Sequence, residues 1–311
     1  MISVVTPCFN EEENVAQLIQ EVEAVFRSMN LEYEHLFIDN CSKDRTVEIL
    51  KQIATQKPQI KIIVNARNFG HIRSPYYGLL QAEGDAVILL AADLQDPPSV
   101  LPELIKKWKE GFDAVIAIKN QSHESPLMYF IRSMYYNLIN RLAEIELAKN
   151  YTGFGLYDKK IIRALRTLND PYPYFRGLIF ELTSSIAKVY YTQPKRFRGI
   201  TKNNFFTLYD IAMLGICSHS KIPLRIATMA GFMLSIFSLI VAFGYGVAKL
   251  IFWDAIPLGI APLIVGLFFL FSVLLFFIGI IGEYIGFVYT KLVHLPLVVE
   301  KERINFRSPE V

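Results

Sequence analysis

The stretch LLAADLQDPP, from Leu89 to Pro98, decides the fold of the first part of the chain. It starts as a short apolar run typical of a buried strand and stops at a carboxylate, Asp93, with Gln95 and Asp96 directly after it. Asp96 stands before two prolines, which is typical of a helix start with the acid as N-cap and proline at the first helical position. A buried strand that passes straight into a helix indicates an α/β unit.

The same alternation of short apolar runs and amphipathic segments extends over about the first two hundred residues. The predicted strands are Ser3–Thr6, Glu34–Ile38, Ile60–Val64, Ala86–Leu90 and Ala114–Ile118. The predicted helices are Glu12–Met29, Arg45–Gln56, Ser74–Ala82 and Pro98–Glu110. Strands that alternate with helices of this length predict a mainly parallel sheet, and ligands of such sheets bind beyond the carboxyl ends of the strands.

Polar residues recur at those carboxyl ends. They are Asn10 after the first strand, then Asp39, Arg67, Asp93 and Lys119 after the following ones. Neither a G-x-G-x-x-G nor a G-x-x-x-x-G-K-[ST] motif accompanies them, which excludes a typical dinucleotide-binding or P-loop site. Phosphate binding must therefore use something other than a glycine-rich backbone cradle.

Asp93 and Gln95 offer hard oxygen ligands to one divalent cation. Magnesium binds through one or two carboxylates and completes its shell with water and substrate phosphates. A backbone that stays extended would point both side chains the same way. The pair predicts a cation site that a bound diphosphate completes.

Two apolar runs, at about 224–252 and 257–289, are each long enough to cross a hydrocarbon core of about 30 Å, which takes about 20 helical residues. The short connection between them predicts an antiparallel hairpin. Basic residues flank it on both sides, so the positive-inside rule puts both termini and the first domain in the cytoplasm. These residues are Lys221, Arg225, Lys291, Lys301, Arg303 and Arg307.

The sequence divides into four parts: a catalytic domain at 1–202, an amphipathic interfacial helix at 203–221, the two transmembrane helices within 222–290, and a cytoplasmic tail at 291–311. Residues after Lys291 alternate enough for a short strand or hairpin, which could pair with another copy of the chain. No signal peptide is expected, because the chain begins with the strand-like MISVVTPCF. The 311 residues carry a net charge of +3, and no nucleic-acid partner is expected.

We expect the cysteines and histidines to have structural roles. The three cysteines are far apart, so neither a disulfide framework nor a zinc site is indicated. No nucleophile–base set is apparent, and the scattered histidines are interpreted as structural: His35, His71, His123 and His219.

Taken together, the motifs resemble those of family 2 glycosyltransferases of the polyprenyl-phosphate branch, which holds dolichol-phosphate mannose synthases and bactoprenol glucosyltransferases. The matching stretches stand in the family's order: VVTPCFNEEENV, IDNCSKDRT, NARNFG, LLAADLQDPP, FRG at Phe175–Gly177, RFRGITK and SHSKIPLR. The resemblance covers nearly the whole chain. It implies a GT-A-type nucleotide-sugar-binding domain with a mainly parallel sheet, followed by the interfacial helix and the transmembrane hairpin.

Carried over to this sequence, the resemblance implies the following roles. The nucleoside would be held by Pro7, Asn10, Glu11, Asp39 and Arg67. The ion on the diphosphate, Mg²⁺ or Mn²⁺, would be held by Asp93 and Gln95. The lipid phosphate would be received by Lys119, Arg132 and Ser133, and a loop closing over the diphosphate would carry Arg196 and Arg198.

Two positions depart from the family pattern. Ala91 stands where the family's D-x-D motif has an acid, and Asp39 is followed by Asn40 instead of a second acid. We interpret both as variation within the glucosyltransferase subtype. The alternative is a catalytically inactive, membrane-anchored module that binds a nucleotide sugar.

The implied reaction is the inverting transfer of a hexose, glucose from UDP-glucose, to undecaprenyl or another polyprenyl phosphate at the inner (plasma) membrane. The product would be a β-linked lipid sugar for modification of a surface glycan such as an O-antigen. Mannose, galactose, N-acetylglucosamine and aminoarabinose remain alternative sugars. A processive polysaccharide synthase is disfavoured, because the Q-x-x-R-W motif and further membrane helices are missing. Self-association through the tail or the membrane helices stays open.

Overall fold

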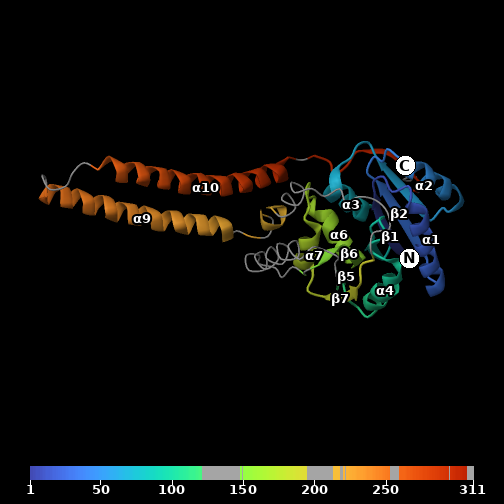
Figure 1. The fold of residues 1–311 in the computed structure, drawn as a ribbon. Helices are drawn as coiled ribbons and strands as arrows, with labels where there is room; N and C mark the ends of the chain where they lie inside the picture. The colour runs from blue at the N-terminus through green and yellow to red at the C-terminus, as the bar shows by residue number, and fades with distance from the viewer. Residues whose placement is uncertain are drawn as a thin grey trace.

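An α/β domain and two long helices that extend away from it make up the structure, a computed structural model (Figure 1). The structure describes residues 1–120, 148, 150–194, 213–217, 220, 222–252, 259–293 and 295–306. Within these ranges, eight strands form one sheet in the order β7-β5-β6-β4-β1-β2-β3-β8.

The strands alternate with helices along most of the chain. The strands are β1 (Ile2–Cys8), β2 (Tyr33–Asp39), β3 (Ile60–Asn65), β4 (Ala86–Leu89), β5 (Ala114–Lys119), β6 (Tyr151–Asp158), β7 (Ile186–Tyr191) and β8 (Glu300–Ile304). The helices are α1 (Val15–Met29), α2 (Thr46–Gln56), α3 (Gly70–Gln81), the 3₁₀ turn η1 (Pro98–Val100), α4 (Leu101–Lys109), α6 (Lys159–Leu168), α7 (Phe175–Leu182), α9 (Ile222–Ile251) and α10 (Ile260–Leu292).

The sheet is mostly parallel at its centre. β1 pairs in parallel with β2 and β4, and β2 pairs in parallel with β3. Strand β6 runs antiparallel between β4 and β5, and β8 runs antiparallel along β3. The central strands are buried on both faces, as covered parallel strands are, and polar side chains such as Ser3, Thr6, Glu34 and His35 are buried in them with the apolar ones.

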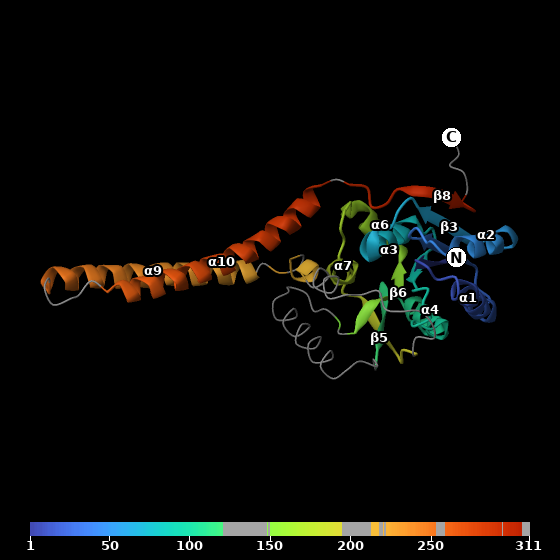
Figure 2. The ribbon, with the colours of Figure 1, turned by 45° about the horizontal axis from the view of Figure 1, so that its top comes forward.

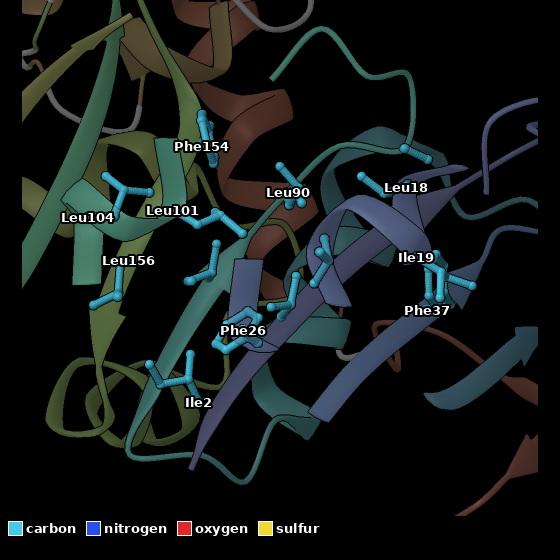
Figure 3. Close-up of a cluster of buried hydrophobic side chains, with 14 of the residues drawn as sticks. Ile2, Leu18, Ile19, Phe26, Phe37, Leu90, Leu101, Leu104, Phe154 and Leu156 are labelled. Carbon is cyan, nitrogen blue, oxygen red and sulfur yellow. The ribbon is translucent and has the colours of Figure 1, made fainter. Parts of the chain in front are cut away.

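Helices cover both faces of the sheet. On one face, α1, α2 and α4 bury Leu18, Phe26, Leu50 and Leu104 in the cluster that Figure 3 shows in part. On the other face, α3, α6 and α7 bury a second cluster that includes Tyr76, Leu79, Leu165 and Ile179. The predicted α/β fold with a mainly parallel sheet is thus confirmed, and the structure adds that an apolar layer of helices covers each face.

Helix α3 lies very close to the sheet at Gly78. A Cβ atom added there would stand 2.9 Å from Cγ1 of Val5 and 3.0 Å from Cγ2 of Ile38, which is closer than packed atoms tolerate. Glycine at this position therefore lets α3 approach the carboxyl ends of β1 and β2.

The segment after α10 returns to the domain. The strand that the sequence indicates after Lys291 forms as β8, and it pairs with β3 of the same chain. The backbone N–H of Ala66 also donates to the carbonyl of Val299 at 2.8 Å. Part of the segment interpreted as a separate tail thus completes the sheet of the first domain.

The two long helices lie side by side in both views (Figures 1 and 2). Of the described residues, one stretch, Gly266–Leu292 with a mean hydropathy of 2.3, is long and apolar enough to cross a membrane, and none of it is buried in the protein. A second apolar stretch, Ile222–Ser238, is shorter than this criterion requires. In the predicted interfacial helix, residues 213–217 are helical, and most of the rest lies outside the described residues.

Candidate active site

A cavity of about 290 Å³ opens beyond the carboxyl ends of β1, β4 and β5. Pro7, Asp93, Gln95 and Lys119 all line it. The structure therefore brings these four positions together at one cavity, and their role as a site stays a prediction. Ala91, which stands in place of an acid, lines the same cavity.

The Asp93–Gln95 turn differs from the extended geometry expected. Leu94 has a φ of 56°, in the left-handed region, which costs an L-residue about 1–2 kcal/mol. Both flanking side chains still line the cavity, and the backbone N–H of Gln95 donates to Oδ1 of Asp93 at 3.2 Å. The turn is strained, and its conformation depends on what surrounds it.

The donor set fits a hard divalent cation that also binds a diphosphate. Asp93 supplies a carboxylate and Gln95 an amide oxygen, which are ligands that Mg²⁺ and Mn²⁺ accept. In the part of the chain that the structure describes, no group of three or more His, Cys, Asp or Glu residues converges as a metal site. An ion held at Asp93 and Gln95 would therefore complete its coordination with substrate oxygens and water.

Asp96 does not cap the following helix, so that prediction is wrong. The 3₁₀ turn begins at Pro98 with no side-chain cap, and Asp96 instead accepts a hydrogen bond from the hydroxyl of Tyr191. Asp96 is 6% exposed, and burial raises the pKa of its carboxyl while the nearby Lys119 opposes that shift. A tertiary partner has replaced the local capping bond.

Two cations line the cavity. Lys119 is at the end of β5, where the sequence predicts a phosphate-binding group, and Arg176 is in the first turn of α7. The Arg176 guanidinium stands 5.9 Å from the ring centroid of Tyr174. Among the described residues, no ion pair joins either cation to an acid, so both charges can serve a bound anion. Sequence reasoning missed Arg176, although it is the arginine of the FRG motif.

Asn10, Glu11 and Asp39 are not among the residues that line the cavity. Asn10 and Glu11 follow β1, and Asp39 is the last residue of β2. The N–H of Asn10 donates to Oγ of Ser42 at 2.8 Å, and the N–H of Glu11 donates to Oγ1 of Thr46 at 2.8 Å. Asp39 is buried and accepts bonds from the N–H and hydroxyl of Ser42. Burial raises the pKa of Asp39, against the Ser42 bonds. The structure ties the β1 and β2 loops together here.

Asn40 shows why an amide follows Asp39. Its Nδ2 donates to Oδ1 of Asn68 at 2.9 Å, while its Oδ1 accepts from the N–H of Phe69 at 2.8 Å. An ionised carboxylate accepts only, so an acid at this position would lose the donated bond. Arg67, also expected in the cleft, instead lies with its guanidinium 4.2 Å from the Phe69 ring centroid.

An apolar junction joins the cavity wall to α10. Tyr174 of the wall packs in one cluster with Leu214 of the 213–217 helix, Ile72 and Phe287. Lys291 at the end of α10 pairs with Asp170 and donates to the carbonyl of Tyr172 at 3.1 Å. The wall of the cavity is therefore continuous with the foot of the apolar helix.

The remaining predicted site residues are not all placed. Arg132, Ser133, Arg196 and Arg198 lie outside the described residues, as do His123 and His219. His35 is buried in the sheet, which agrees with a structural role, whereas His71 lines the cavity.

Comparison with known proteins adds a family and a fold. Residues 3–166 match the family described as glycosyl transferase family 2. A glycosyltransferase of Synechocystis sp. that its name calls uncharacterised is 35% identical over 297 residues, which are 95% of this chain and 93% of that protein. The bactoprenol glucosyl transferase of Shigella phage SfV is 32% identical over 301 residues, covering 96% of this chain and 98% of that protein.

Among solved structures, glucosyl-3-phosphoglycerate synthase from Mycobacterium tuberculosis, in complex with Mn²⁺, uridine diphosphate and phosphoglyceric acid, aligns with a TM-score of 0.50. The alignment covers 70% of this chain and 76% of that one at 20% identity, which shows a shared fold.

Proposed function

The chain belongs to glycosyl transferase family 2 and is a glycosyltransferase, and from that premise we propose that it transfers glucose from UDP-glucose to a polyprenyl phosphate. One observation carries the proposal: the cavity that presents Asp93, Gln95, Lys119 and Arg176 has a wall that continues into the foot of an apolar helix. Such a junction would let a nucleotide sugar in the cavity meet the phosphate of a lipid held beside the apolar helix. The bactoprenol glucosyl transferases at 32% identity support this acceptor class.

The reaction needs no strong base. A phosphate monoester has a second pKa near 6, so the acceptor oxygen is already anionic at neutral pH. That oxygen attacks the anomeric carbon, the bond from this carbon to the diphosphate breaks, and the electron pair leaves with UDP. Attack from the face opposite the leaving group inverts an α-linked donor to a β-linked lipid phosphate.

The residues of the chain supply positive charge and position. Asp93 and Gln95 would hold Mg²⁺ or Mn²⁺, which when bound neutralises charge on the departing diphosphate. Lys119 and Arg176, and Arg132 with Ser133 from outside the described residues, would hold the acceptor phosphate against the repulsion of a second polyanion. Pro7, Asn10, Glu11, Asp39 and Arg67 would form the nucleoside side, with Arg196 and Arg198 over the diphosphate.

The helix pair supports a location at the inner (plasma) membrane. We assign α9 and α10 as an antiparallel transmembrane hairpin with both flanks cytoplasmic, because the exposed surfaces of both helices are apolar over most of their length. Tethering the catalytic domain beside the bilayer raises the effective concentration of a lipid-borne phosphate.

Purified full-length protein, labelled UDP-glucose, Mn²⁺ and a short polyprenyl phosphate test the proposal. We expect labelled lipid with a β linkage by NMR, and no product from Asp93→Ala. Glu103→Ala, which removes an exposed acid of α4, is the matched control and should retain full activity. A panel of UDP and GDP sugars tests the donor: faster transfer of another sugar would overturn UDP-glucose. Binding of nucleotide sugars without transfer to any lipid would overturn the reaction itself.

A further inference from the structure

The buried bond between Tyr191 and Asp96 joins two parts of the site that are far apart in sequence. Tyr191 ends β7, and Asp96 follows the Asp93–Gln95 turn after β4. Both residues are nearly inaccessible, at 5% and 6% exposure. The Tyr191 ring also packs edge-on against Phe154, with ring centroids 5.5 Å apart, so its hydroxyl is directed by a fixed ring.

The turn needs such an anchor. Leu94 holds a left-handed backbone that an L-residue does not adopt without support from its surroundings. On its C-terminal side, Pro97 and Pro98 have no N–H and cannot donate a backbone hydrogen bond. The side chain of Asp96 is thus the polar group that fastens this end of the turn.

The same tyrosine is next to the cation at the end of β5. Tyr191 stands opposite Lys119 in the parallel register of β5 and β7, and the carbonyl of Tyr191 accepts the N–H of Asn120 at 2.9 Å. A shift of the Tyr191 strand end would therefore move the lysine and the Asp93–Gln95 turn together.

We propose that Tyr191, acting through Asp96, is a positioning residue that sets the affinity of the Asp93–Gln95 turn for the divalent cation. The inference rests on the function proposed above, in which these two side chains hold that ion. Outer residues that orient metal ligands typically change metal affinity 10- to 100-fold when they are removed. A residue with only a structural role would change stability and leave the affinity as it is.

Tyr191→Phe in the full-length protein removes the hydroxyl and keeps the ring. Tyr190→Phe is the matched control, because Tyr190 is the preceding residue of β7 and is 58% exposed. Mn²⁺ binding in the presence of UDP is measured by electron paramagnetic resonance, independently of turnover. We expect about 10-fold weaker Mn²⁺ binding for Tyr191→Phe and wild-type binding for Tyr190→Phe. The Mn²⁺ concentration for half-maximal transfer should rise equally, with kcat at saturating Mn²⁺ within about twofold of wild type.

Asp96→Asn separates positioning from direct ligation. Its amide oxygen can still accept the Tyr191 hydrogen bond, so Mn²⁺ affinity should stay within about threefold of wild type. A loss as large as that of Asp93→Ala would make Asp96 itself a ligand and overturn the inference.

Mn²⁺ binding by Asp93→Ala distinguishes a failure of the positioning role of Tyr191 from a failure of the metal site itself. If it abolishes Mn²⁺ binding while Tyr191→Phe matches Tyr190→Phe, the positioning role is wrong and the metal site stands. If it leaves Mn²⁺ binding unchanged, or if the wild-type protein with UDP binds no Mn²⁺, the metal assignment fails and the inference fails with it.

Discussion

Arg176 lines the cavity, and its guanidinium forms no ion pair with an acid among the described residues. A hydrogen bond to a charged group contributes about 1.5–3 kcal/mol, or roughly 10- to 100-fold in rate or affinity. We therefore expect Arg176→Ala to lower transfer by at least about 10-fold and Arg176→Lys to lower it less. Kinetics at varied acceptor and donor concentrations would show which phosphate the arginine binds. Arg163→Ala, an exposed arginine of α6, is the control, and equal losses from both variants would contradict the assignment.

His35 is a buried neutral imidazole in β2, with Nε2 2.8 Å from Oγ1 of Thr6. Burial lowers the pKa of His35 to about 3, whereas an unfolded chain has a histidine pKa of about 6.5. Between these values the unfolded state binds one more proton, so the free energy of unfolding falls as the pH falls, by up to about 1.4 kcal/mol per unit. The stabilisation is complete above about pH 6.5.

Denaturation of the full-length protein in detergent between pH 7.5 and 5.5 tests the His35 assignment. His35→Gln should show a shallower loss of stability on acidification than wild type, since carboxylate contributions are common to both. Identical slopes would show that His35 does not titrate on unfolding.

The site residues that sequence predicts are those at strand ends. Pro7, Asp93 and Lys119 could be found because parallel strands deliver their carboxyl ends to one edge of a sheet. Arg176 could not, since it lies at a helix start whose position depends on tertiary packing. The Tyr191–Asp96 hydrogen bond could not be predicted from the sequence, because its partners are 95 residues apart and the two prolines after Asp96 favoured a helix cap.

One predicted helix start and one predicted helix cap are wrong for the same reason. The helix predicted to begin at Ser74 begins at Gly70, so Ser74 is internal to α3, and Asp96 does not act as the predicted N-cap. The Ser74 hydroxyl accepts instead from Nδ2 of Asn65 at 3.0 Å. In both cases a buried partner from another strand competes successfully with the backbone N–H that a cap would satisfy.

Strand prediction succeeded where burial is two-sided. The five predicted strands all form, as β1 to β5, because each contains a short, mostly apolar run. Strand β6, with Gly153 and Gly155 inside it, lacks that run, and β7 alternates in burial as an edge strand. Strand β6 pairs antiparallel with β5, and β7 pairs parallel with it. Both pairings are long-range, and no local sequence pattern encodes them.

The C-terminal strand is fastened by Asn305. Its Nδ2 donates to the carbonyls of Ala54 and Ile60, both at 2.9 Å, and its φ is 59°. Asn305→Ala should lower the free energy of local opening of β8 by roughly 2–4 kcal/mol, because two hydrogen bonds are lost and an alanine must adopt a left-handed backbone. Asn305→Gly loses the same bonds, but glycine adopts the left-handed backbone without strain, so the opening free energy should fall less than in Asn305→Ala. Hydrogen exchange of the β8 amides measures this local opening, and equal protection in wild type and both variants would contradict it.

The ion pair of Lys291 with Asp170 docks the end of α10 on the segment that leads to the cavity wall. A pair of this kind contributes about 1 kcal/mol, which corresponds to about fivefold. Lys291→Met should therefore lower transfer to a long-chain acceptor in proteoliposomes about fivefold and spare a short acceptor in detergent.

Arg225→Met is the control for the Lys291 prediction, because it removes an exposed charge of the same sign from α9. Equal losses from both variants, or equal losses with both acceptors, would show that membrane charge and not docking is responsible.

Strand β8 joins β3 from more than 200 residues later in the chain. A ribosome adding about 5–20 residues per second would leave the outer edge of β3 bare for about 10–50 seconds. The apolar helices emerge in that interval, before the strand that covers the edge. With the membrane topology proposed above, insertion into the bilayer would precede closure of the sheet, and a nascent chain stalled at insertion would expose β3 to quality-control proteases and to the edges of its neighbours.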